Sequence, residues 1–282
     1  MKFSKIKSYA KLNLSLNVIK KIPKKLHAIE SLVTFINFYD LIYIREIKAL
    51  KHKIKFFGKF SKNITKNNTV NNLLNLLDKK DLLKGKKFEI KIIKNIPQKS
   101  GMGGGSMNAA TILNFLIKKK FVKINQKKIL QITNLIGSDV ILGIVQKSTI
   151  LSSSGGIKKF LKSSNFYILL VRPNFGCSTI KIYSGVKKFS KPVLSNPNKN
   201  MLNLRFLLKQ ENALEKVAFS KYPKLKKLKS FMENLNQPLF VRMTGSGSVI
   251  VAYYQNNQDC ELAKVKFKRK FKNYWCNASK TI

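Results

Sequence analysis

The most regular hydrophobic pattern of the chain lies near its N-terminus. From Tyr9 to Val18, apolar and polar residues alternate strictly. One face carries Ala10, Leu12, Leu14, Leu16 and Val18, and the other carries Tyr9, Lys11, Asn13, Ser15 and Asn17. Because successive side chains of a strand point to opposite faces, this alternation predicts a half-buried β-strand with a polar second face.

Further elements follow as far as about residue 156. Apolar runs predict strands at 32–38, 40–47 and 88–93, with Asp40 in a turn between the first two. Residues 148–156 predict a strand that runs into a turn. Helical spacing of apolar residues predicts helices at 69–83, 108–119 and 126–137, the last one closed by Gly137.

The pattern changes after residue 156. A strand is predicted at 166–172, stopped by Pro173, and helical segments are predicted within 204–219 and 222–235. Residues 239–254 read as two strands around a glycine–serine turn, and a lysine-rich helix follows before the short segment 273–279. We find no internal repeat and no low-complexity linker. The mixture predicts an α+β fold of two lobes, with domains at 1–156 and 157–282.

Composition narrows the class of protein. The chain has 282 residues, 44% of them hydrophobic, as is usual for globular proteins. No apolar run approaches the ~20 residues of a membrane-spanning helix, and the basic N-terminus has no apolar core of a signal peptide. The three separated cysteines, Cys177, Cys260 and Cys276, predict neither a disulfide framework nor a zinc site. We therefore expect a cytoplasmic protein without a membrane partner.

The formal net charge of +44 allows two interpretations. The lysines are spread from end to end among abundant Asn, Ile and Phe, which is the composition that A/T-rich codons produce. This spread favours a solvated basic surface arising from compositional drift over a polyanion-binding role. Under either interpretation, the electric field of the protein attracts anionic ligands.

The segment Asn95–Leu116 contains a dense glycine cluster at Gly101, Gly103, Gly104 and Gly105. The cluster lies between a predicted strand and a predicted helix, where free N–H groups and the helix dipole favour an anion. Ser106 and Asn108 are candidate caps of that helix, and Ser106 is also placed to reach a phosphate or a metal ion. The loop lacks the Walker A ending and the third glycine of the dinucleotide fingerprint. A purely structural glycine loop is the alternative.

Two further stretches accompany the glycine loop. Residues 7–18 place Lys11 and Asn13 on one strand face, and residues 242–254 set a second turn of small residues before an apolar strand. In this order the three stretches resemble the three motifs of the GHMP kinase superfamily. The resemblance runs from about residue 8 to about residue 255 and is closest to the branch that acts on a CDP-linked methylerythritol.

The resemblance implies both a fold and a reaction. The fold would have an N-terminal lobe similar to a ribosomal-protein domain and a second α/β lobe. The reaction would be the ATP-dependent phosphorylation of the 2-hydroxyl of the CDP-linked methylerythritol, in the non-mevalonate route to isoprenoid precursors. The chain would then be a small-molecule kinase with ATP and Mg²⁺ as its cofactors.

Roles for individual residues follow from the same resemblance. Asp139 would take the proton from the attacking hydroxyl, and Lys11 would balance the charge on the transferred phosphoryl group. ATP would contact Pro97, Gln98, Lys99, Ser100, Gly101, Met102, Gly103, Gly104, Gly105, Ser106 and Asn108, with Mg²⁺ at Ser106. The substrate would contact Asn13, His27, Tyr183, Gly245 and Ser246. Without the resemblance, a simple helix N-cap is the favoured interpretation of Asp139, and Lys11 is one of 56 basic residues.

The chain departs from the superfamily pattern just before His27. Lys24, Lys25 and Leu26 stand where aspartate, glycine and a stacking tyrosine are usual, so Tyr183 becomes the expected aromatic partner of the cytosine. This departure keeps open another GHMP kinase, acting on homoserine or mevalonate. A basic nucleic-acid-binding protein is the alternative from a different class, and it would gather basic residues and aromatic rings on one face. We expect no specific nucleic-acid partner, and the oligomeric state stays open.

Overall fold

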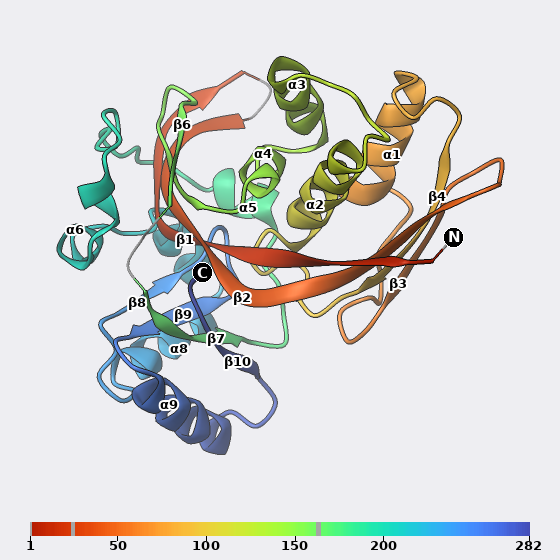
Figure 1. Cartoon of the computed structure of the whole chain (residues 1–282). Helices are drawn as coiled ribbons and strands as arrows, with labels where there is room; N and C mark the ends of the chain where they lie inside the picture. Colours follow the sequence, from red (N-terminus) through yellow and green to blue (C-terminus); the bar gives the residue numbers. More distant parts are fainter. Residues whose placement is uncertain (1, 24–25, 162–164) are drawn as a thin grey trace. The chain divides into compact units, whose positions relative to one another are not determined.

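The computed structural model describes residues 2–23, 26–161 and 165–282, with only the backbone described at Leu26. The chain forms two compact units (Figure 1). Unit 1 comprises Met1–Ala10, Phe38–Gln98 and Gly103–Gln146, and unit 2 comprises Lys11–Asn37, Lys99–Met102 and Lys147–Ile282. Helices and strands occur in both units, which confirms the predicted α+β class. The predicted boundary between residues 156 and 157 stays a prediction.

Unit 1 is a sheet with helices packed on one face. Its strands are the first part of β1 (Ser4–Ile22), the second part of β2 (Leu26–Ile47), β3 (Lys53–Phe57) and β4 (Lys87–Ile93). β4 pairs antiparallel with β2 and parallel with β3. The helices are α1 (Thr69–Lys79), α2 (Gly104–Lys118), α3 (Gln126–Ile136) and α4 (Val140–Ile144).

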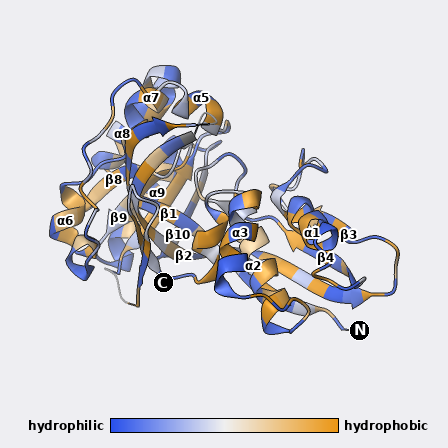
Figure 2. Cartoon of the chain, turned by 90° about the horizontal axis from the view of Figure 1, so that it is seen from above, coloured by the Kyte–Doolittle hydropathy of each residue, from blue (hydrophilic) through white to orange (hydrophobic). Residues whose placement is uncertain are grey.

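The core of unit 1 follows from the alternation along its strands. In β4 the side chains of Phe88, Ile90 and Ile92 are fully buried, and their neighbours in sequence are not. They pack with Leu73 of α1 and Leu113 of α2 in one hydrophobic cluster. Figure 2 accordingly shows hydrophobic and hydrophilic residues along the same strands.

The predicted turn at Asp40 is wrong. β2 is one continuous strand from Leu26 to Ile47, and Asp40 lies inside it with a fully buried side chain. The carboxylate accepts hydrogen bonds from the backbone N–H groups of Asn95 and Ile96 and from the side chains of Lys94 and Asn108. An aspartate usually signals a turn because it binds its own backbone locally. Here donors more than fifty residues away satisfy the carboxylate instead.

The predicted half-buried strand at Tyr9–Val18 is a strand, but from Ala10 to Val18 it is buried on both faces. The apolar face is buried as expected, and Lys11, Asn13 and Ser15 are at most 4% exposed as well. The alternation indicates that one face of the strand is apolar. It does not indicate whether other elements of the fold cover the polar face. In unit 2 these polar side chains have hydrogen-bonding partners, which offsets the cost of their burial.

Unit 2 contains two groups of strands. The first part of β2 pairs antiparallel with β5 (Ser148–Leu151), which pairs with β6 (Ile157–Phe160). An antiparallel sheet has the order β10 (Trp275–Lys280), β7 (Tyr167–Arg172), β9 (Ile250–Tyr254) and β8 (Phe240–Met243). The helical elements are α5 (Thr179–Tyr183), the 3-10 helix Lys199–Leu202, α6 (Leu204–Leu208), α7 (Leu214–Lys221), α8 (Pro223–Glu233) and α9 (Asn257–Lys270).

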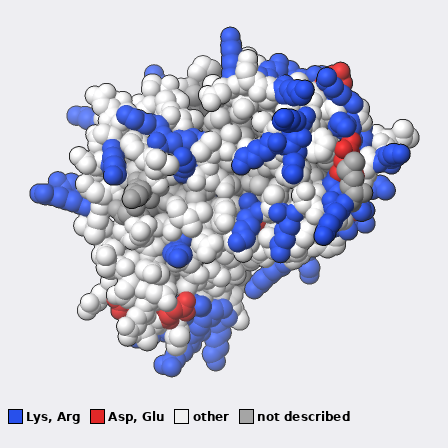
Figure 3. All heavy atoms as spheres, in the orientation of Figure 1, with Lys and Arg blue, Asp and Glu red and all other residues white. Residues whose placement is uncertain are grey.

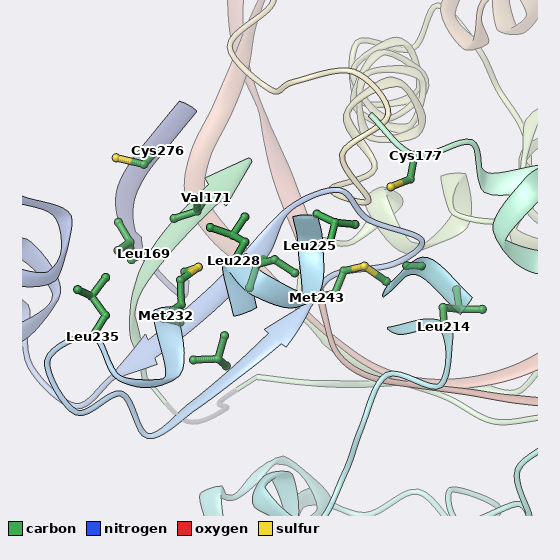
Figure 4. Close-up of a cluster of buried hydrophobic side chains, with 14 of the residues drawn as sticks. Leu169, Val171, Cys177, Leu214, Leu225, Leu228, Met232, Leu235, Met243 and Cys276 are labelled. Atoms are coloured by element: carbon green, nitrogen blue, oxygen red, sulfur yellow. The ribbon is translucent and has the colours of Figure 1, made fainter. Parts of the chain in front are cut away.

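The core of unit 2 joins the second sheet to its helices. Leu169 and Val171 of β7 lie in one cluster with Leu228 and Met232 of α8 and with Met243 of β8 (Figure 4). The helical stretch predicted within 204–219 is interrupted between α6 and α7. The guanidinium of Arg242 donates to the carbonyl oxygens of Leu207 and Gln210 beside this interruption.

Candidate active site

The glycine loop ends at the N-terminus of α2 in unit 1. The helix begins at Gly104, and its N-cap is Gly103 in a left-handed conformation with φ of 69°. No side chain caps this end, so the predicted capping by Ser106 and Asn108 is wrong. Ser106 lies half-buried in the first turn of the helix, where its N–H is available to a ligand. An uncapped N-terminus of a 15-residue helix is a favourable site for a phosphate group.

Asp40 holds the segment that leads into this loop. Its Oδ1 accepts from the N–H groups of Asn95 and Ile96 at 2.7 and 2.8 Å. Its Oδ2 accepts from Lys94 Nζ and, at 3.1 Å, from Asn108 Nδ2 on α2. One buried carboxylate therefore connects the end of β4 to the first turns of α2. Sequence reasoning missed this role because the partners of Asp40 lie far away in the chain.

Lys94 places a buried cation beside the same helix end. Its side chain is 5% exposed and forms an ion pair with Asp40. A Cβ atom added to Gly104 would lie 3.4 Å from Lys94 Nζ and 3.0 Å from Ile96 Cγ2. Glycine at the first position of α2 thus allows the helix to start close against the loop.

Asp139 also lies in unit 1, directly before α4. It occupies the N-cap position, but its side chain makes no capping hydrogen bond to that helix. α4 packs tightly on α2, because a Cβ atom at Gly143 would lie 2.7 Å from the Cβ of Ala110. The carboxylate is therefore carried by a short helix that rests on the helix of the glycine loop. The alternative of a simple helix cap is not supported by this geometry.

Lys11 and Asn13 form a buried polar chain in unit 2. Lys11 Nζ donates to Asn13 Oδ1 at 2.6 Å, and Asn13 Nδ2 donates to Ser31 Oγ at 2.7 Å. Ser31 Oγ in turn donates to the carbonyl oxygen of Ser15 at 2.6 Å. These contacts orient the amide of Asn13 and hold the ammonium of Lys11, which is 4% exposed. Lys11 is thus unlike the solvated lysines that dominate the chain.

The three sequence motifs meet in unit 2. The N–H of Lys11 donates to the carbonyl oxygen of Met102, and the N–H of Asn13 donates to Thr244 Oγ1 at 2.9 Å. Thr244 precedes the second glycine turn, whose Gly245 lies against Gly101 of the first loop. A Cβ atom at Gly101 would lie 1.9 Å from the carbonyl oxygen of Thr244. Glycine at position 101, where φ is 78°, is therefore required by backbone packing.

The second glycine turn is braced by the segment 212–215. Asn212 Nδ2 donates to the carbonyl oxygens of Met243 and Gly245 at 2.7 and 2.8 Å. Glu215 Oε1 accepts from the N–H of Met243 at 2.7 Å. Asn212 and Glu215 thus support the backbone of the second glycine turn. Ser246, within the turn, exchanges a hydrogen bond with Thr179 of α5 at 2.9 Å.

His27 and Tyr183 come together elsewhere in unit 2. Their ring centroids are 5.3 Å apart, with an interplanar angle of 37°. His27 Nε2 is buried and has no hydrogen-bond partner in the described part of the chain. Burial, assisted by the nearby charge of Lys21, lowers the pKa of His27 below 6.5. A neutral imidazole next to an aromatic ring suits a planar polar ligand. Lys24, Lys25 and the Leu26 side chain lie outside the described residues.

The remaining residues predicted to contact ATP lie just before the glycine loop. Gln98 Nε2 donates to the carbonyl oxygens of Phe60 and Lys62, so its amide supports the loop. Pro97 is buried and Lys99 is exposed, and the carbonyl oxygen of Lys99 accepts from the N–H groups of Cys177 and Ser248. Within the described residues, no group of three or more His, Cys, Asp or Glu side chains forms a metal cluster. No described helix is long and apolar enough to cross a membrane.

Comparison with known families agrees with the motif geometry. Residues 68–146 match the GHMP kinases N terminal domain, and residues 190–273 match the GHMP kinases C terminal domain. The first match contains the glycine loop and Asp139, and the second contains the glycine turn at 245–247. The two matches confirm the expected two-lobed GHMP kinase fold.

Individual relatives indicate the branch of the family to which the chain belongs. A 4-diphosphocytidyl-2-C-methyl-D-erythritol kinase of Pelagibacter ubique is 55% identical over 278 residues, which are 99% of each chain. One of Petrotoga mobilis is 32% identical, covering 87% of this chain and 96% of the relative. A crystal structure of 4-(cytidine 5'-diphospho)-2C-methyl-D-erythritol kinase has the same fold, with a TM-score of 0.78 at 20% identity over 99% of both chains. The chain therefore belongs to the GHMP kinase family and, within it, to the 4-diphosphocytidyl-2-C-methyl-D-erythritol kinases.

Proposed function

We propose that this kinase transfers the γ-phosphoryl group of ATP to the 2-hydroxyl of 4-diphosphocytidyl-2-C-methyl-D-erythritol. The observation that carries the proposal is the buried chain of Lys11 and Asn13, which is hydrogen-bonded to the glycine loop and to Thr244. The 55% identity to the Pelagibacter ubique kinase supports the choice of substrate. The product would serve isoprenoid precursor synthesis by the non-mevalonate route.

ATP binding is assigned to the glycine loop and the start of α2. The N–H groups of Gly104, Gly105 and Ser106 at the start of α2 are suited to donate hydrogen bonds to phosphate oxygens. The buried ion pair of Lys94 with Asp40 lies beside Gly104 and supports this helix end. Because Asp40 fixes both Asn95 and Asn108, the helix end is held in place before the nucleotide arrives.

Two side chains are assigned to the chemical step. Asp139 accepts the proton of the attacking hydroxyl, as the resemblance to the GHMP kinases implies. Lys11 offsets negative charge on the transferred phosphoryl group, and Asn13 keeps the ammonium oriented through the 2.6 Å hydrogen bond. A positioned cation of this kind needs no reorganisation when the charge develops.

Mg²⁺ is assigned to the nucleotide phosphates, with Ser106 as a protein contact. Mg²⁺ in kinases is held largely by substrate phosphates and water, with few protein ligands. The described residues fit this arrangement, because they offer the Ser106 hydroxyl near the helix end and no dedicated carboxylate cluster. When bound, Mg²⁺ would neutralise phosphate charge during transfer.

The cytosine end of the substrate is assigned to His27 and Tyr183. The unpartnered, buried Nε2 of His27 offers a hydrogen bond to a base edge, and the Tyr183 ring 5.3 Å away offers an apolar surface. Gly245 and Ser246 are assigned to the phosphorylated part of the substrate. The hydroxyl of Ser246 is already oriented by Thr179.

We also assign the protein to the cytoplasm. Its three cysteines are free and buried, and burial raises the pKa of Cys177 to about 11 and that of Cys260 to about 12. Such thiols are protonated and unreactive in a reducing compartment.

The test is a product assay. The purified chain is incubated with ATP, Mg²⁺ and the CDP-linked methylerythritol, and phosphorus NMR locates the new phosphate ester. A singly phosphorylated product at the 2-hydroxyl is expected, with no product from homoserine or mevalonate. Asp139→Asn should lower kcat by roughly 10²–10⁴-fold while ATP affinity is retained. Turnover of homoserine or mevalonate in place of the cytidine compound would overturn the assignment.

A further inference from the structure

The second face of the unit 1 sheet carries aromatic rings interleaved with basic side chains. We define the aromatic–basic face by Phe3, Lys5, Lys7 and Tyr9 along β1; Tyr39, Tyr43 and Arg45 on β2; Glu89 and Lys91 on β4; and Lys53, Lys55 and Phe57 on β3. The members are two residues apart on β1, β3 and β4, and Leu41 lies between Tyr39 and Tyr43 on the same face of β2, as strand alternation requires. The intervening residues, such as Ile44 and Ile90, face the helices and form the core.

Strand register and ring contacts place these side chains on one surface. Arg45 is opposite Glu89 and Tyr43 is opposite Lys91, while Lys55 pairs with Lys91 from the other side. The rings of Phe3 and Tyr43 are 6.5 Å apart, and those of Tyr9 and Tyr39 are 5.4 Å apart. Side chains at paired positions of neighbouring strands project to the same side of the sheet. The face therefore spans all four strands of unit 1.

Cations rest directly on the rings of this face. The guanidinium of Arg45 lies 4.4 Å from the Phe3 ring centroid, and Lys91 Nζ lies 4.7 Å from it. Lys7 Nζ lies 4.6 Å from the Tyr39 ring centroid. Lys5, Lys7, Lys53 and Lys55 are exposed, and Phe57 is 46% exposed. Within unit 1, the described helices α1 and α2 share their core with the opposite face of these strands (Figure 1).

The charge of the aromatic–basic face is strongly positive. Glu89 is the one carboxylate in the set defined above, and it is already shared by Arg45 and Lys91 at 2.5 and 3.6 Å. Lys5, Lys7, Lys53 and Lys55 have no carboxylate within this set. Such a surface complements a ligand that carries both repeated negative charge and planar rings. Phosphate alone or an acidic peptide would leave the rings unused.

We propose that the aromatic–basic face binds single-stranded nucleic acid without sequence preference. The lysine ammonium groups would move from the rings to the phosphates and form ion pairs with them. The uncovered rings of Tyr39, Tyr43 and Phe3 would then stack with unpaired bases. Stacking on aromatic side chains is open only to bases that are not already in a duplex. Across the chain as a whole the lysines are spread evenly, but in this sheet strand alternation gathers them on one side. The proposal is independent of the kinase reaction.

The test compares matched variants in a binding assay. The probe is a fluorescently labelled oligothymidylate or oligouridylate of about 15 nucleotides, within the ~4–16 nucleotides typical of single-strand sites. The face variant carries Lys5→Gln, Lys7→Gln and Lys55→Gln. The control carries Lys224→Gln, Lys226→Gln and Lys227→Gln on α8, which removes the same charge from exposed positions in unit 2. Fluorescence anisotropy gives the affinity of each protein at several salt concentrations.

The salt dependence separates a site from diffuse attraction. Each single-strand phosphate contact contributes about −0.7 to the slope of log K against log salt concentration. Because the face variant lacks three lysines, its slope should be less steep than that of the wild type by about 2. The control variant should keep the wild-type slope. Equal losses in both variants would mean that the whole surface attracts the strand, and the proposal would be wrong.

A second arm tests the rings. A duplex of the same length has the higher charge density, so purely electrostatic binding favours the duplex, whereas stacking favours the single strand. Tyr39→Leu with Tyr43→Leu should weaken single-strand binding several-fold and leave kinase turnover unchanged. Tighter binding to duplex than to single strand overturns the proposal. So does stronger binding of the wild type to anionic lipid vesicles than to either oligonucleotide.

Discussion

Strand β1 carries one alternating pattern through two environments. In its first part, within unit 1, Lys5 and Lys7 are exposed and Lys7 lies over the ring of Tyr39. In its second part, within unit 2, Lys11 is 4% exposed and donates to Asn13. On the opposite side of β1, Ile6 packs against the core of unit 1, and Leu12 and Leu14 are buried in unit 2. The difference therefore lies on the polar face alone, and the sequence pattern does not reveal it.

This difference separates the candidate active-site lysine from the many other lysines of a very basic chain. Lysine and arginine side chains are scattered over much of the face seen in Figure 3, so charge by itself marks no single site. Burying an ammonium group is costly unless it is paired or hydrogen-bonded. Lys11 and Lys94 are both buried and both have defined partners, and both lie beside the glycine loop or its helix. Burial with a partner is thus more informative than charge.

The largest effect is expected when a buried ion pair is broken. Asp40→Asn leaves the Lys94 ammonium buried without its carboxylate, which should cost about 3–5 kcal/mol in the free energy of unfolding. Urea unfolding measures this change. Glu89→Gln is the matched control on the exposed side of the same sheet, where solvent screens the pair with Arg45. It should leave the unfolding free energy nearly unchanged.

A double variant sharpens this result. Asp40→Asn combined with Lys94→Met removes both members of the pair and should recover part of the lost stability, because no buried charge remains unpaired. If Asp40→Asn alone is as mild as Glu89→Gln, then Asp40 does not anchor the loop.

Two glycines with the same backbone conformation allow the effect of backbone strain to be measured separately from the effect of packing. Gly101 and Gly85 have φ of 78° and 75°, but an added Cβ atom would meet Thr244 only at Gly101. Gly85→Ala should lower the free energy of unfolding by about 1–2 kcal/mol, because alanine is strained in the left-handed conformation. Gly101→Ala should lower the free energy of unfolding by a further ~1–3 kcal/mol, because its methyl group overpacks against Thr244. It should also weaken ATP binding.

Calorimetric titration with ATP gives the affinities of both glycine variants. Gly85→Ala should bind ATP as the wild type does, since Gly85 has open space around it. Equal stability and equal ATP affinity in the two variants would contradict the role assigned to Gly101.

The smallest effect is a pH dependence of stability. The pKa of His27 is lowered below 6.5 by burial and by Lys21, so the unfolded chain binds a proton at a higher pH than the folded chain does. The contribution of His27 is therefore complete above about pH 6.5 and declines as the pH falls through the folded pKa. His27→Gln should remove this part of the pH dependence of Tm.

The other histidine provides the control for this measurement. The pKa of His52 is also lowered, mainly by burial, so His52→Gln should remove a separate part of the same pH dependence. An identical pH profile of Tm in wild type and His27→Gln would show that His27 is not held in its neutral form.

Most of the fold could be predicted because local patterns dominate its elements. The strands β4, β7, β8 and β9 and the helices α1 and α3 lie where alternation or helical spacing placed them. β3 and β6 were missed, because each is short and pairs with a partner that the local sequence does not specify. Asp40 was misplaced for the same reason, since its donors at Lys94, Asn95 and Asn108 are distant in sequence.

Part of the site could also be predicted, through the motif resemblance. The contacts of Lys11 with Asn13 and Met102, and of Gly101 with Thr244, bring the three motifs together as the resemblance implies. The capping of α2 was predicted wrongly, because Ser106 and Asn108 are usual caps and the helix begins earlier, at Gly104. Burial of the polar face of β1 was missed, because it depends on Ser31 and Thr244 from other elements.

The most direct test of the account compares two lysines four residues apart on β1. Lys11→Met and Lys7→Met remove the same charge, but only Lys11 is buried and bonded to Asn13. Phosphoryl transfer from ATP to 4-diphosphocytidyl-2-C-methyl-D-erythritol is measured for both variants at saturating substrate. We expect kcat to fall by roughly 10²–10³-fold for Lys11→Met, as when an electrostatic stabiliser of the transition state is removed, and to stay unchanged for Lys7→Met. Equal turnover by the two variants would contradict the account.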